Sequence, residues 1–355
     1  MSKIRVAIVA GGQSSEHEIS CISAGGVLTA IDRDKFEPVL IGITKSGKWV
    51  LPDPDIQLAI TDGELPQIPE GAALLSADLN GFASAVGPLN IDVIFPVLHG
   101  PYGEDGTFQG ACEMAGYRYV GSGVLASATA MDKSFAKAIF RAQGLKVADG
   151  IDIHQRQWPD SANNIRGQVQ QLGLPVFVKP ARGGSSRGTT KVKSLDSLNS
   201  AVEEAFNFDT KVMIEKAIVG REIECAVLQE RGLTSASGVG EIKILGDHEF
   251  YDFNAKYLDN STEVQIPADI SEQISEKVRA AAIKAFDALG CEGLARVDFF
   301  YSENGEIILN EINTMPGFTS TSVYPKLWQA AGKSYRELIT VLLESALTRS
   351  MSVTR

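Results

Sequence analysis

The dipeptide Asn304-Gly305 lies between two apolar runs and constrains the fold more than any other feature of this sequence. Asn-Gly in this context is a strong signal for a β-hairpin, because both residues tolerate a positive φ. A two-residue turn there would place Asp298 directly opposite Glu311, and Arg296 directly opposite Asn313. Side chains alternate between the two faces of a strand, so all four would lie on one face.

Two carboxylates that face each other across a sheet repel and destabilise it. A divalent cation between Asp298 and Glu311 would turn this repulsion into attraction. Carboxylate and amide oxygens suit Mg²⁺, which is usually held by few carboxylates together with substrate phosphates. The sequence therefore predicts a magnesium site at Asp298, Glu311 and Asn313. The alternative is a solvated hairpin face whose charges have no function.

Composition excludes several classes of protein. A length of 355 residues is sufficient for two or three domains. The net charge of −11 argues against a general binder of nucleic acid or anionic membranes, which needs basic patches. The four cysteines have no metal-binding spacing, and no apolar run reaches the roughly 18–20 residues that span a bilayer. We therefore expect a cytoplasmic protein with small-molecule substrates and neither a nucleic-acid nor a membrane partner.

The order of the apolar runs predicts an α/β protein, α+β in parts, with three domains. Residues 1–125 contain predicted strands over 6–10, 37–43 and 91–98, which alternate with helices after a capping box at Ser15-x-x-Glu18 and over about 107–115. This alternation indicates a doubly wound α/β domain. Residues 52–69 are predicted to form a surface loop.

The remaining chain has a different pattern. Residues 126–215 combine predicted helices over 131–143 and 197–206 with strands over 176–179, 189–192 and 211–215, which suggests a central α+β domain. Residues 216–355 are rich in strands, over 223–229 and 238–243, followed by a long helix over 270–289, the hairpin and a closing helix over 334–348. This pattern predicts a third domain built on a sheet.

Residues 183–188, Gly-Gly-Ser-Ser-Arg-Gly, lie in the stretch of highest glycine and serine density. The segment joins two predicted strands, so it is neither a Walker A motif nor a Rossmann fingerprint. Glycines allow backbone amides to approach phosphate oxygens, and serine hydroxyls add donors. Lys179 could add a positive charge. The alternative is a mobile surface hairpin.

Three further positions favour a nucleotide. Lys133 begins a predicted helix, where its charge opposes the helix dipole unless an anion is bound. Glu215-Lys216 ends a strand, where backbone groups could contact an adenine edge, and Glu222 could hold ribose hydroxyls. A solvated lysine and structural carboxylates are the alternatives.

Other candidates could bind a substrate or stabilise a reacting group. Glu16 in the first helical turn could bind a substrate ammonium, or simply complement the dipole. His99 ends a strand at the edge where α/β sheets bind ligands, although it could merely cap. The Gly317 amide could stabilise an oxyanion. The irregular stretch over 246–262 holds Lys256 and Tyr257 and is typical of a functional loop, with aromatic packing as the alternative.

Together these strings resemble one family, the D-alanine–D-alanine ligases of the ATP-grasp superfamily. Eight pieces occur in the family's order and make a chance match improbable. The matching pieces are residues 10–18, 99–106, 131–133, 179–186, 215–216, 256–257, 296–298 and 310–317.

The resemblance implies an ATP-grasp fold with ATP between the central and C-terminal domains. It also implies that two D-alanines are joined through an acylphosphate for peptidoglycan precursor synthesis, in a homodimeric enzyme. Two Mg²⁺ ions, which Mn²⁺ could replace, would lie on Asp298, Glu311 and Asn313. By resemblance the nucleotide residues are Lys133, Lys179, Gly184, Ser185, Ser186, Glu215, Lys216, Glu222 and Lys256. The catalytic residues are Glu16, Ser185, Tyr257, Arg296 and Gly317, and the substrate-binding residues are Glu16, His99, Lys256, Arg296 and Ser322.

Tyr257 bears on the second substrate. Relatives that form the ester D-alanyl-D-lactate lack this tyrosine, so its presence favours an amine over a hydroxyl. Tyr257, Ser185 and a bound water remain candidates for the base. Arg187 and Asn254 depart from the family's pattern without removing a catalytic group. The alternatives are a D-alanine–D-lactate ligase, another ATP-grasp carboxylate–amine ligase, and a nucleotide-binding regulatory protein with a degenerate site.

Overall fold

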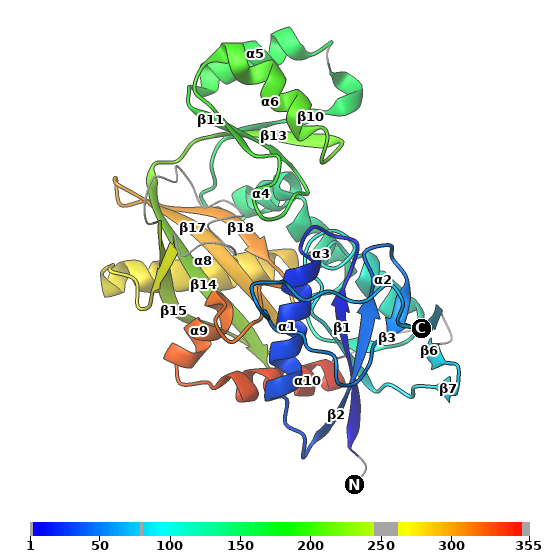
Figure 1. Cartoon of the computed structure of the whole chain (residues 1–355). Helices are drawn as coiled ribbons and strands as arrows, with labels where there is room; N and C mark the ends of the chain where they lie inside the picture. Colours follow the sequence, from blue (N-terminus) through cyan, green and yellow to red (C-terminus); the bar gives the residue numbers. More distant parts are fainter. Residues whose placement is uncertain (1–2, 79–80, 159, 245–261, 350–355) are drawn as a thin grey trace.

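The computed structural model describes residues 3–78, 81–158, 160–244 and 262–349. The chain forms three units, each built on its own large sheet, and the central unit stands above the other two in Figure 1. The predicted functional loop over 246–262, with Lys256 and Tyr257, lies outside the described residues except for Thr262. Within the described part of the chain, no helix is both long enough and apolar enough to cross a membrane.

The N-terminal unit contains a six-stranded sheet in the order β4-β3-β2-β1-β8-β9. Strand β1 (Ile4–Gly11) pairs in parallel with β2 (Phe36–Ile43) and β8 (Val93–Pro96), and β8 pairs in parallel with β9 (Arg118–Tyr119). The short strands β3 (Trp49–Leu51) and β4 (Ala73–Leu74) extend the sheet antiparallel at one edge. A small separate sheet comprises β5 (Ser76–Asp78), β6 (Gly81–Ser84) and β7 (Gly87–Pro88).

Both faces of this sheet are covered, as the doubly wound prediction requires. Val6, Ile8 and Ala10 pack with helix α1 (His17–Ala30) on one face. Their neighbours Ala7 and Val9 face the other side, where helix α2 (Thr107–Met114) contributes to the core. The alternating strand residues are all fully buried, which explains why the parallel strands read as continuous apolar runs.

The predicted capping box at the start of α1 is wrong, although the helix itself is confirmed. The helix begins at His17 with Glu16 at the N-cap, and no side chain caps it. Ser14 instead accepts a hydrogen bond from the Glu16 amide at 3.2 Å and donates to the His99 carbonyl at 2.7 Å. The turn is therefore fixed against the strand that ends near His99, and the Glu16 side chain is available to the site.

The central unit is a four-stranded antiparallel sheet in the order β10-β13-β11-β12. Its strands are β10 (Gly150–His154), β11 (Val176–Pro180), β12 (Thr190–Val192) and β13 (Lys211–Lys216). Helices α5 (Ala162–Leu172) and α6 (Leu198–Ala205), with short 3-10 turns at Gln155–Gln157 and Leu195–Ser197, complete the unit. Val176 pairs with Val192, so the glycine-rich segment is the hairpin loop that the sequence predicted.

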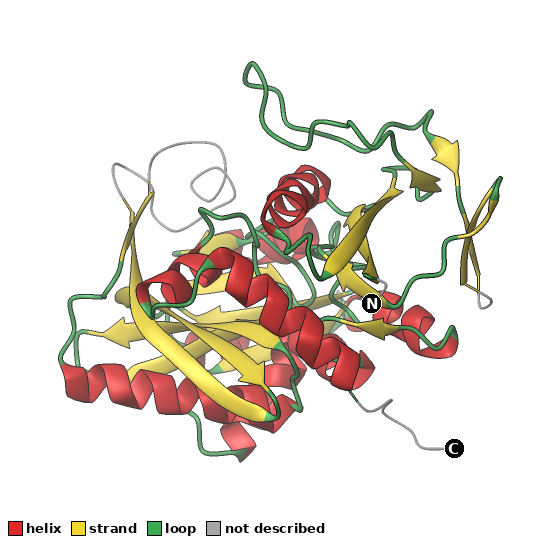
Figure 2. Cartoon of the chain, turned by 90° about the horizontal axis from the view of Figure 1, so that it is seen from below, coloured by secondary structure: helices red, strands yellow, loops and turns green. Residues whose placement is uncertain are grey.

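The C-terminal unit is a five-stranded antiparallel sheet in the order β16-β15-β14-β17-β18. The strands are β14 (Gly220–Glu230), β15 (Leu233–Ile244), β16 (Thr262–Gln265), β17 (Leu294–Ser302) and β18 (Ile307–Asn313). Helix α8 (Glu272–Leu289) packs on one face. Figure 2 shows the strands of this sheet layered between helices.

The cores link the units. Helices α3 (Val124–Met131) and α4 (Lys133–Ala142) share the core of α8 and the C-terminal sheet. Helices α9 (Val323–Ala330) and α10 (Tyr335–Thr348) cover the sheet's other face and share a core with α1 and β1. The predicted helix over 131–143 is confirmed as α4, which begins at Lys133 because the Asp132 side chain caps it, whereas α3 was not predicted.

Candidate active site

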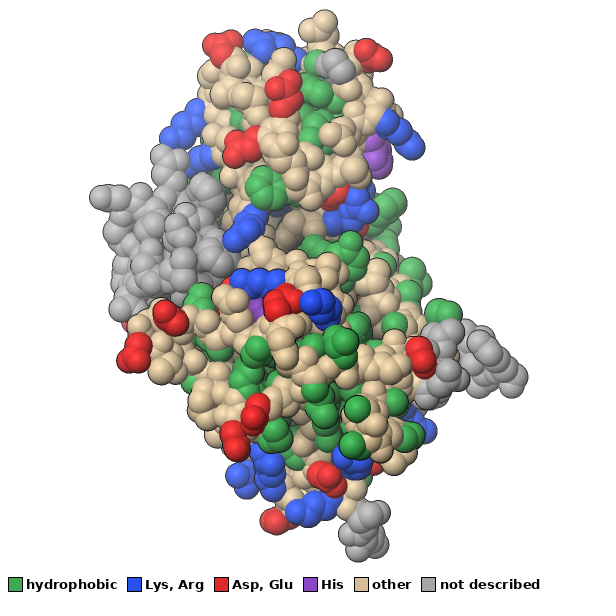
Figure 3. Space-filling view, turned by 45° about the vertical axis from the view of Figure 1, so that its right-hand side comes forward, with side chains coloured by type: hydrophobic (Ala, Val, Ile, Leu, Met, Phe, Trp, Pro, Cys, Tyr) green, Lys and Arg blue, Asp and Glu red, His purple; other side chains and the backbone are tan. Residues whose placement is uncertain are grey.

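A cavity of about 430 Å³ lies where the three units meet. Figure 3 shows a hollow below the central unit, in which basic, acidic and histidine side chains gather. A smaller cavity of about 140 Å³ lies between the central and C-terminal sheets. The two cavities share Lys133, Gly183, Ser185 and Glu311, so they adjoin at these residues.

The β17–β18 hairpin supplies the acidic face, but by a different route from the one predicted. Asp298 pairs with Glu311 and Arg296 with Asn313, as predicted. The two-residue turn is wrong, because Ser302 and Glu306 close a three-residue loop in which Gly305 has φ +77°. This turn shifts the register by one residue, and a bulge at Asn310 shifts it back before Glu311.

The predicted common face is confirmed by direct contacts. Arg296 donates two hydrogen bonds of 2.7 Å to the two Asp298 carboxylate oxygens. The Asn313 amide nitrogen also donates to Asp298, at 3.0 Å. Glu224 on β14 pairs with Asp298 in the ladder, and its carboxylate lies 3.0 Å from the Arg296 guanidinium. One arginine thus balances two adjacent carboxylates.

The donor set fits a hard divalent cation. Asp298, Glu311 and Asn313 offer oxygen ligands on one face, beside cavities large enough for phosphates. No cluster of three or more histidine, cysteine or acidic side chains suited to a metal occurs among the described residues. Two carboxylates and an amide therefore need further oxygens from a substrate, as is usual for Mg²⁺.

Glu16 and Ser185 meet across the large cavity. Ser185 donates a hydrogen bond to the Glu16 carboxylate, which is buried (7% exposed) at the N-cap of α1. Ser185 and Ser186 both have positive φ, of 49° and 57°, which strains residues other than glycine. The surroundings therefore fix the loop in an unusual backbone conformation that directs Ser185 toward Glu16.

The glycine-rich loop also contacts Lys133, the first residue of α4. Lys133 donates from Nζ to the Gly183 carbonyl at 2.7 Å, and the same ammonium lies 3.2 Å from the Glu311 carboxylate. Lys133 is thus largely shielded from solvent, with a side chain 14% exposed, and is not the solvated lysine of the alternative interpretation. The glycine-rich loop lines both cavities, so it is not a free surface hairpin.

Glu215 lies in a charge cluster that the sequence did not suggest. Its carboxylate lies 2.7 Å from the Lys179 ammonium and also pairs with Lys137 on α4. Burial alone would raise the pKa of Glu215, but the two lysines lower it to about 2. Lys216 and Glu222 line the same small cavity, at the strand ends where they were predicted.

Two further titratable groups, His99 and Glu104, line the large cavity near Glu16. His99 is buried, and its ring nitrogens contact the Met315 carbonyl at 3.0 Å and the Ser23 hydroxyl at 3.1 Å. Burial lowers the pKa of His99, which favours the neutral imidazole. Glu104 accepts a hydrogen bond from the Gly100 amide at 2.8 Å, and burial together with the Glu16 charge raises its pKa to about 8.

Gly317 and Ser322 close the cavity on the α9 side. A Cβ on Gly317 would lie 3.2 Å from the Ser322 hydroxyl oxygen, so these residues approach closely. Ser322 is the N-cap of α9, and its hydroxyl accepts a hydrogen bond from the Thr319 amide at 3.1 Å. A carboxylate placed here would face the positive end of the helix dipole.

The structure gathers every described residue of the predicted site around these two cavities. Three residues with evident roles were missed: Glu104, Lys137 and Glu224. Lys137 lies one helical turn beyond Lys133, and Glu224 lies two residues beyond Glu222 on the same strand face, so periodicity could have found both. Glu104 gave no signal beyond its glycine-rich surroundings.

The fold and site define an ATP-grasp ligase. A doubly wound domain precedes two sheet units, which hold lysines, a glycine-rich loop and paired carboxylates between them. Family models of the D-Ala–D-Ala ligase N-terminus and C-terminus match residues 5–122 and 139–344. The chain belongs to the D-alanine–D-alanine ligase family, whose members are ATP-dependent carboxylate–amine ligases.

Individual relatives agree over nearly the whole chain. The chain is 50% identical to the D-alanine–D-alanine ligase of Pseudarthrobacter chlorophenolicus, covering 98% of this chain and 95% of the relative. Among solved structures, the VanG D-Ala:D-Ser ligase of Enterococcus faecalis matches with a TM-score of 0.84 and 34% identity, over 97% of this chain and 100% of that one. The D-alanine–D-alanine ligase of Coxiella burnetii matches with a TM-score of 0.82 and 33% identity, over 97% and 95%.

Proposed function

We propose that this chain uses ATP to join two D-alanines into D-alanyl-D-alanine for peptidoglycan precursor synthesis, through an acylphosphate. The contact that carries the proposal is Lys133 between Gly183 and Glu311, at the junction of the two cavities. The nucleotide would occupy one cavity and the amino acids the other. The Lys133 ammonium and the Glu311 carboxylate lie where the two cavities meet. Family membership supports the same reaction.

The residues that line the small cavity and its junction with the large one suit a nucleotide. Glu215, Lys216 and Glu222 would contact the base and ribose, while Lys133, Lys179 and the loop residues Gly184, Ser185 and Ser186 would contact the phosphates. Lys179 is paired with Glu215, and a triphosphate competes for this lysine because it offers more negative charge. Lys256 would join this set from the part of the chain outside the described residues.

Asp298, Glu311 and Asn313 would hold two Mg²⁺ ions, which Mn²⁺ could replace. Magnesium would supply charge neutralisation between the phosphates during transfer. Arg296 would be released from part of its pairing with Asp298 and would face the large cavity, which it lines. The three ligands hold their positions through the hairpin ladder rather than through a flexible loop.

The amino acids would occupy the large cavity. Glu16 would bind the ammonium of the first D-alanine, and Ser185 would orient the Glu16 carboxylate through its hydrogen bond. His99 would line the same pocket. The second D-alanine would place its carboxylate at Ser322 and the α9 N-terminus. Arg296 and the Gly317 amide would stabilise the tetrahedral oxyanion, each contributing roughly 3–4 kcal/mol if well placed. Tyr257, Ser185 or water would accept the proton from the incoming ammonium.

The second substrate separates this proposal from its rivals. The match to a D-Ala:D-Ser ligase makes D-serine a specific second candidate, because its hydroxymethyl group enlarges D-alanine by one oxygen only. D-Lactate would give an ester, and Tyr257 argues against it. We further propose a cytoplasmic homodimer, as the family resemblance implies.

The test is magnesium- and ATP-dependent ADP release in a coupled assay, with products identified by mass. D-Alanine alone, D-alanine with D-serine, D-alanine with D-lactate, and L-alanine are compared. We expect turnover with D-alanine alone and the dipeptide as the main product. A mixed product would show that the second substrate is D-serine or D-lactate. ADP release that does not depend on an amino acid would contradict the proposed ligase activity.

A further inference from the structure

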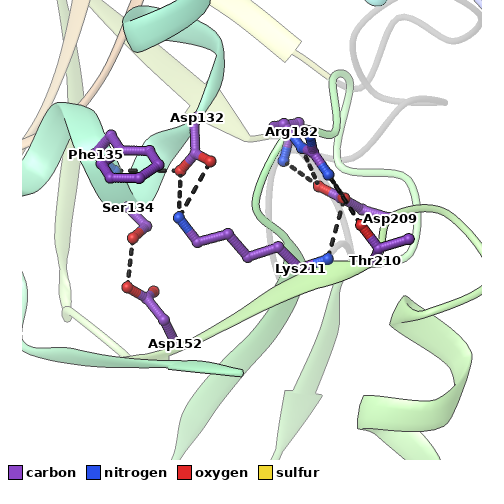
Figure 4. A network of polar contacts seen from close by, with 8 residues as sticks. All are labelled: Asp132, Ser134, Phe135, Asp152, Arg182, Asp209, Thr210 and Lys211. Carbon is purple, nitrogen blue, oxygen red and sulfur yellow. Dashed lines mark hydrogen bonds and ion pairs between the residues drawn. The ribbon is translucent and has the colours of Figure 1, made fainter. Parts of the chain in front are cut away.

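A polar network that takes no part in the proposed chemistry joins residues around the start of α4, the entry of the glycine-rich loop and the start of β13 (Figure 4). Its centre is Lys211, the first residue of β13, whose ammonium lies 2.9 and 3.1 Å from the two carboxylate oxygens of Asp132. Both residues are buried, with 5% and 6% of their surface exposed. The Phe135 ring covers the same ammonium at 4.1 Å from its centroid. The ion pair is thus shielded from solvent on several sides.

A second pair lies beside the first. Asp209 accepts hydrogen bonds from the Arg182 amide at 2.8 Å and from its Nε at 3.1 Å, and a third from Nη2. The same carboxylate accepts from the Lys211 amide at 3.1 Å. Arg182 directly precedes the glycine-rich loop, so the entry to that loop is fixed to the start of β13.

Backbone hydrogen bonds connect these pairs to Lys133. The Ala181 amide donates to the Lys211 carbonyl at 2.9 Å, and the Lys133 amide donates to the Ala181 carbonyl at 3.0 Å. Asp132, which pairs with Lys211, precedes Lys133 and caps α4 by accepting from the Phe135 amide at 3.2 Å. Three segments that are distant in sequence therefore meet at the two residues Asp209 and Lys211.

We propose that Lys211 and Asp209 are positioning residues that hold Lys133 and the glycine-rich loop in the arrangement that binds ATP phosphates. The inference rests on the proposed function, since it assigns Lys133 and this loop to the nucleotide. The Lys133 ammonium has to be near both Gly183 and Glu311, and small displacements of such groups weaken binding and catalysis strongly. We call the contacts among Asp132, Arg182, Asp209 and Lys211 the clasp. The clasp connects α4 and the entry of the glycine-rich loop to the first residue of β13.

The alternative is that the network only stabilises the fold. A buried ion pair that loses one partner leaves an uncompensated charge, so stability falls in either case. The proposal makes an additional claim, because Lys133 and Gly183, which the network positions, line the nucleotide cavity, whereas the D-alanine residues His99 and Ser322 lie on other elements that the network does not contact. Loss of the clasp should therefore change ATP binding more than D-alanine binding.

The experiment compares the full-length wild type with Lys211→Met, Lys211→Arg and Arg182→Met. Arg182 is half exposed, so its variant keeps the test possible if Lys211→Met does not fold. The control is Arg166→Met, which breaks bonds to the Leu195 carbonyl and Asp196 in the same unit, away from the loop. Readouts are the KM values for ATP and D-alanine, kcat, thermal stability, and binding of a non-hydrolysable ATP analogue with magnesium.

We expect Lys211→Met to raise the KM for ATP and the analogue's Kd by about tenfold or more. The KM for D-alanine should rise less, because Ser185 lies on the same loop but His99 and Ser322 are held by other elements. Arg182→Met should change the same two constants in the same direction, and Lys211→Arg should recover most of the loss, because it keeps the charge. Arg166→Met should leave all three constants near wild type. Equal changes in both KM values, or an unchanged analogue Kd in a folded Lys211→Met or Arg182→Met protein, would overturn the inference.

Failure of the proposed function gives a different result. A wild type that binds the analogue but forms no D-alanyl-D-alanine would overturn the ligase proposal, while the analogue Kd values would still test the clasp. A wild type that makes the dipeptide, with variants whose nucleotide constants do not change, would retain the function and reject the clasp.

Discussion

Ser185 donates a hydrogen bond to Glu16 from 169 residues further along the chain. The bond joins the N-cap of α1 in the N-terminal unit to the glycine-rich loop of the central unit. Both residues line the amino-acid cavity, so the bond forms part of its wall.

Replacing Ser185 with alanine should lower kcat for dipeptide formation by about tenfold to a hundredfold, because Glu16 loses the donor that orients it. The KM for ATP should change less. The matched control is Ser186→Ala, since Ser186 shares the left-handed backbone but lines only the nucleotide cavity. That variant should act mainly on the KM for ATP, and identical kinetic effects of the two substitutions would contradict separate roles.

Replacing Lys137 with methionine should raise the KM for ATP by about tenfold, because Glu215 then retains Lys179 as its counter-ion and competes with the phosphates for it. Steady-state kinetics with varied ATP measures this effect. Arg141→Met, further along α4 and exposed, is the control and should leave the KM for ATP unchanged. An unchanged KM for ATP in Lys137→Met would show that Lys179 can bind the phosphates without Lys137 as a second counter-ion for Glu215.

Asp298→Asn and Glu311→Gln should each raise the magnesium concentration for half-maximal activity by roughly tenfold or more, because a charged ligand is lost. The titration is run at fixed, saturating ATP. Glu306→Gln provides the control on the same hairpin, where the exposed carboxylate pairs with Lys146. If the control shifts the magnesium titration equally, the effect is one of general surface charge.

Glu104→Gln should flatten the pH dependence of stability between about pH 5 and pH 8. The folded pKa of Glu104 is about 8, above the ordinary carboxyl value, so the folded state binds more protons in this range. Its contribution to stability is present at low pH and is lost as the pH rises through 8. Denaturant unfolding at several pH values should therefore show the variant gaining stability relative to wild type near pH 8, and a constant difference would contradict the raised pKa.

Gly11→Ala should destabilise the fold by about 2–4 kcal/mol, because φ is +93° and the new Cβ would lie 2.2 Å from the Ile43 carbonyl oxygen. Gly63→Ala separates the two causes, since Gly63 has φ +81° but nothing within 4 Å of the added carbon. That control should cost about 1 kcal/mol. Equal losses in urea unfolding would mean that backbone strain alone accounts for Gly11.

Local sequence signals predicted most strands and helices but not how their ends are formed. The Asp298–Glu311 and Arg296–Asn313 pairs were predicted from a two-residue turn that does not exist. Asn-Gly is compatible both with that turn and with a three-residue loop that has glycine at its end. The bulge at Asn310 compensates for the difference, and no local feature of the sequence required it.

Elements with weak apolar periodicity were missed. Helix α5 is rich in asparagine and glutamine and buries only Ile165 and Val169, so its sequence resembles a loop. Helix α3 was missed because its residues are small or apolar nearly all round, so it shows no alternation of a polar and an apolar face. Contacts such as Glu215 with Lys137 depend on how α4 packs against β13, which residue spacing alone does not determine.

The bulge at Asn310 has a consequence for how this hairpin can vary. The one-residue register shift that the turn over 303–305 introduces is reversed at Asn310, so Asp298 and Glu311 still pair directly. We therefore expect a change in the length of this turn to disturb Asp298 and Glu311 less than an insertion or deletion inside β17 or β18 would. For the same reason the tip is a convenient place to attach a fluorescent reporter or a surface anchor to a working enzyme.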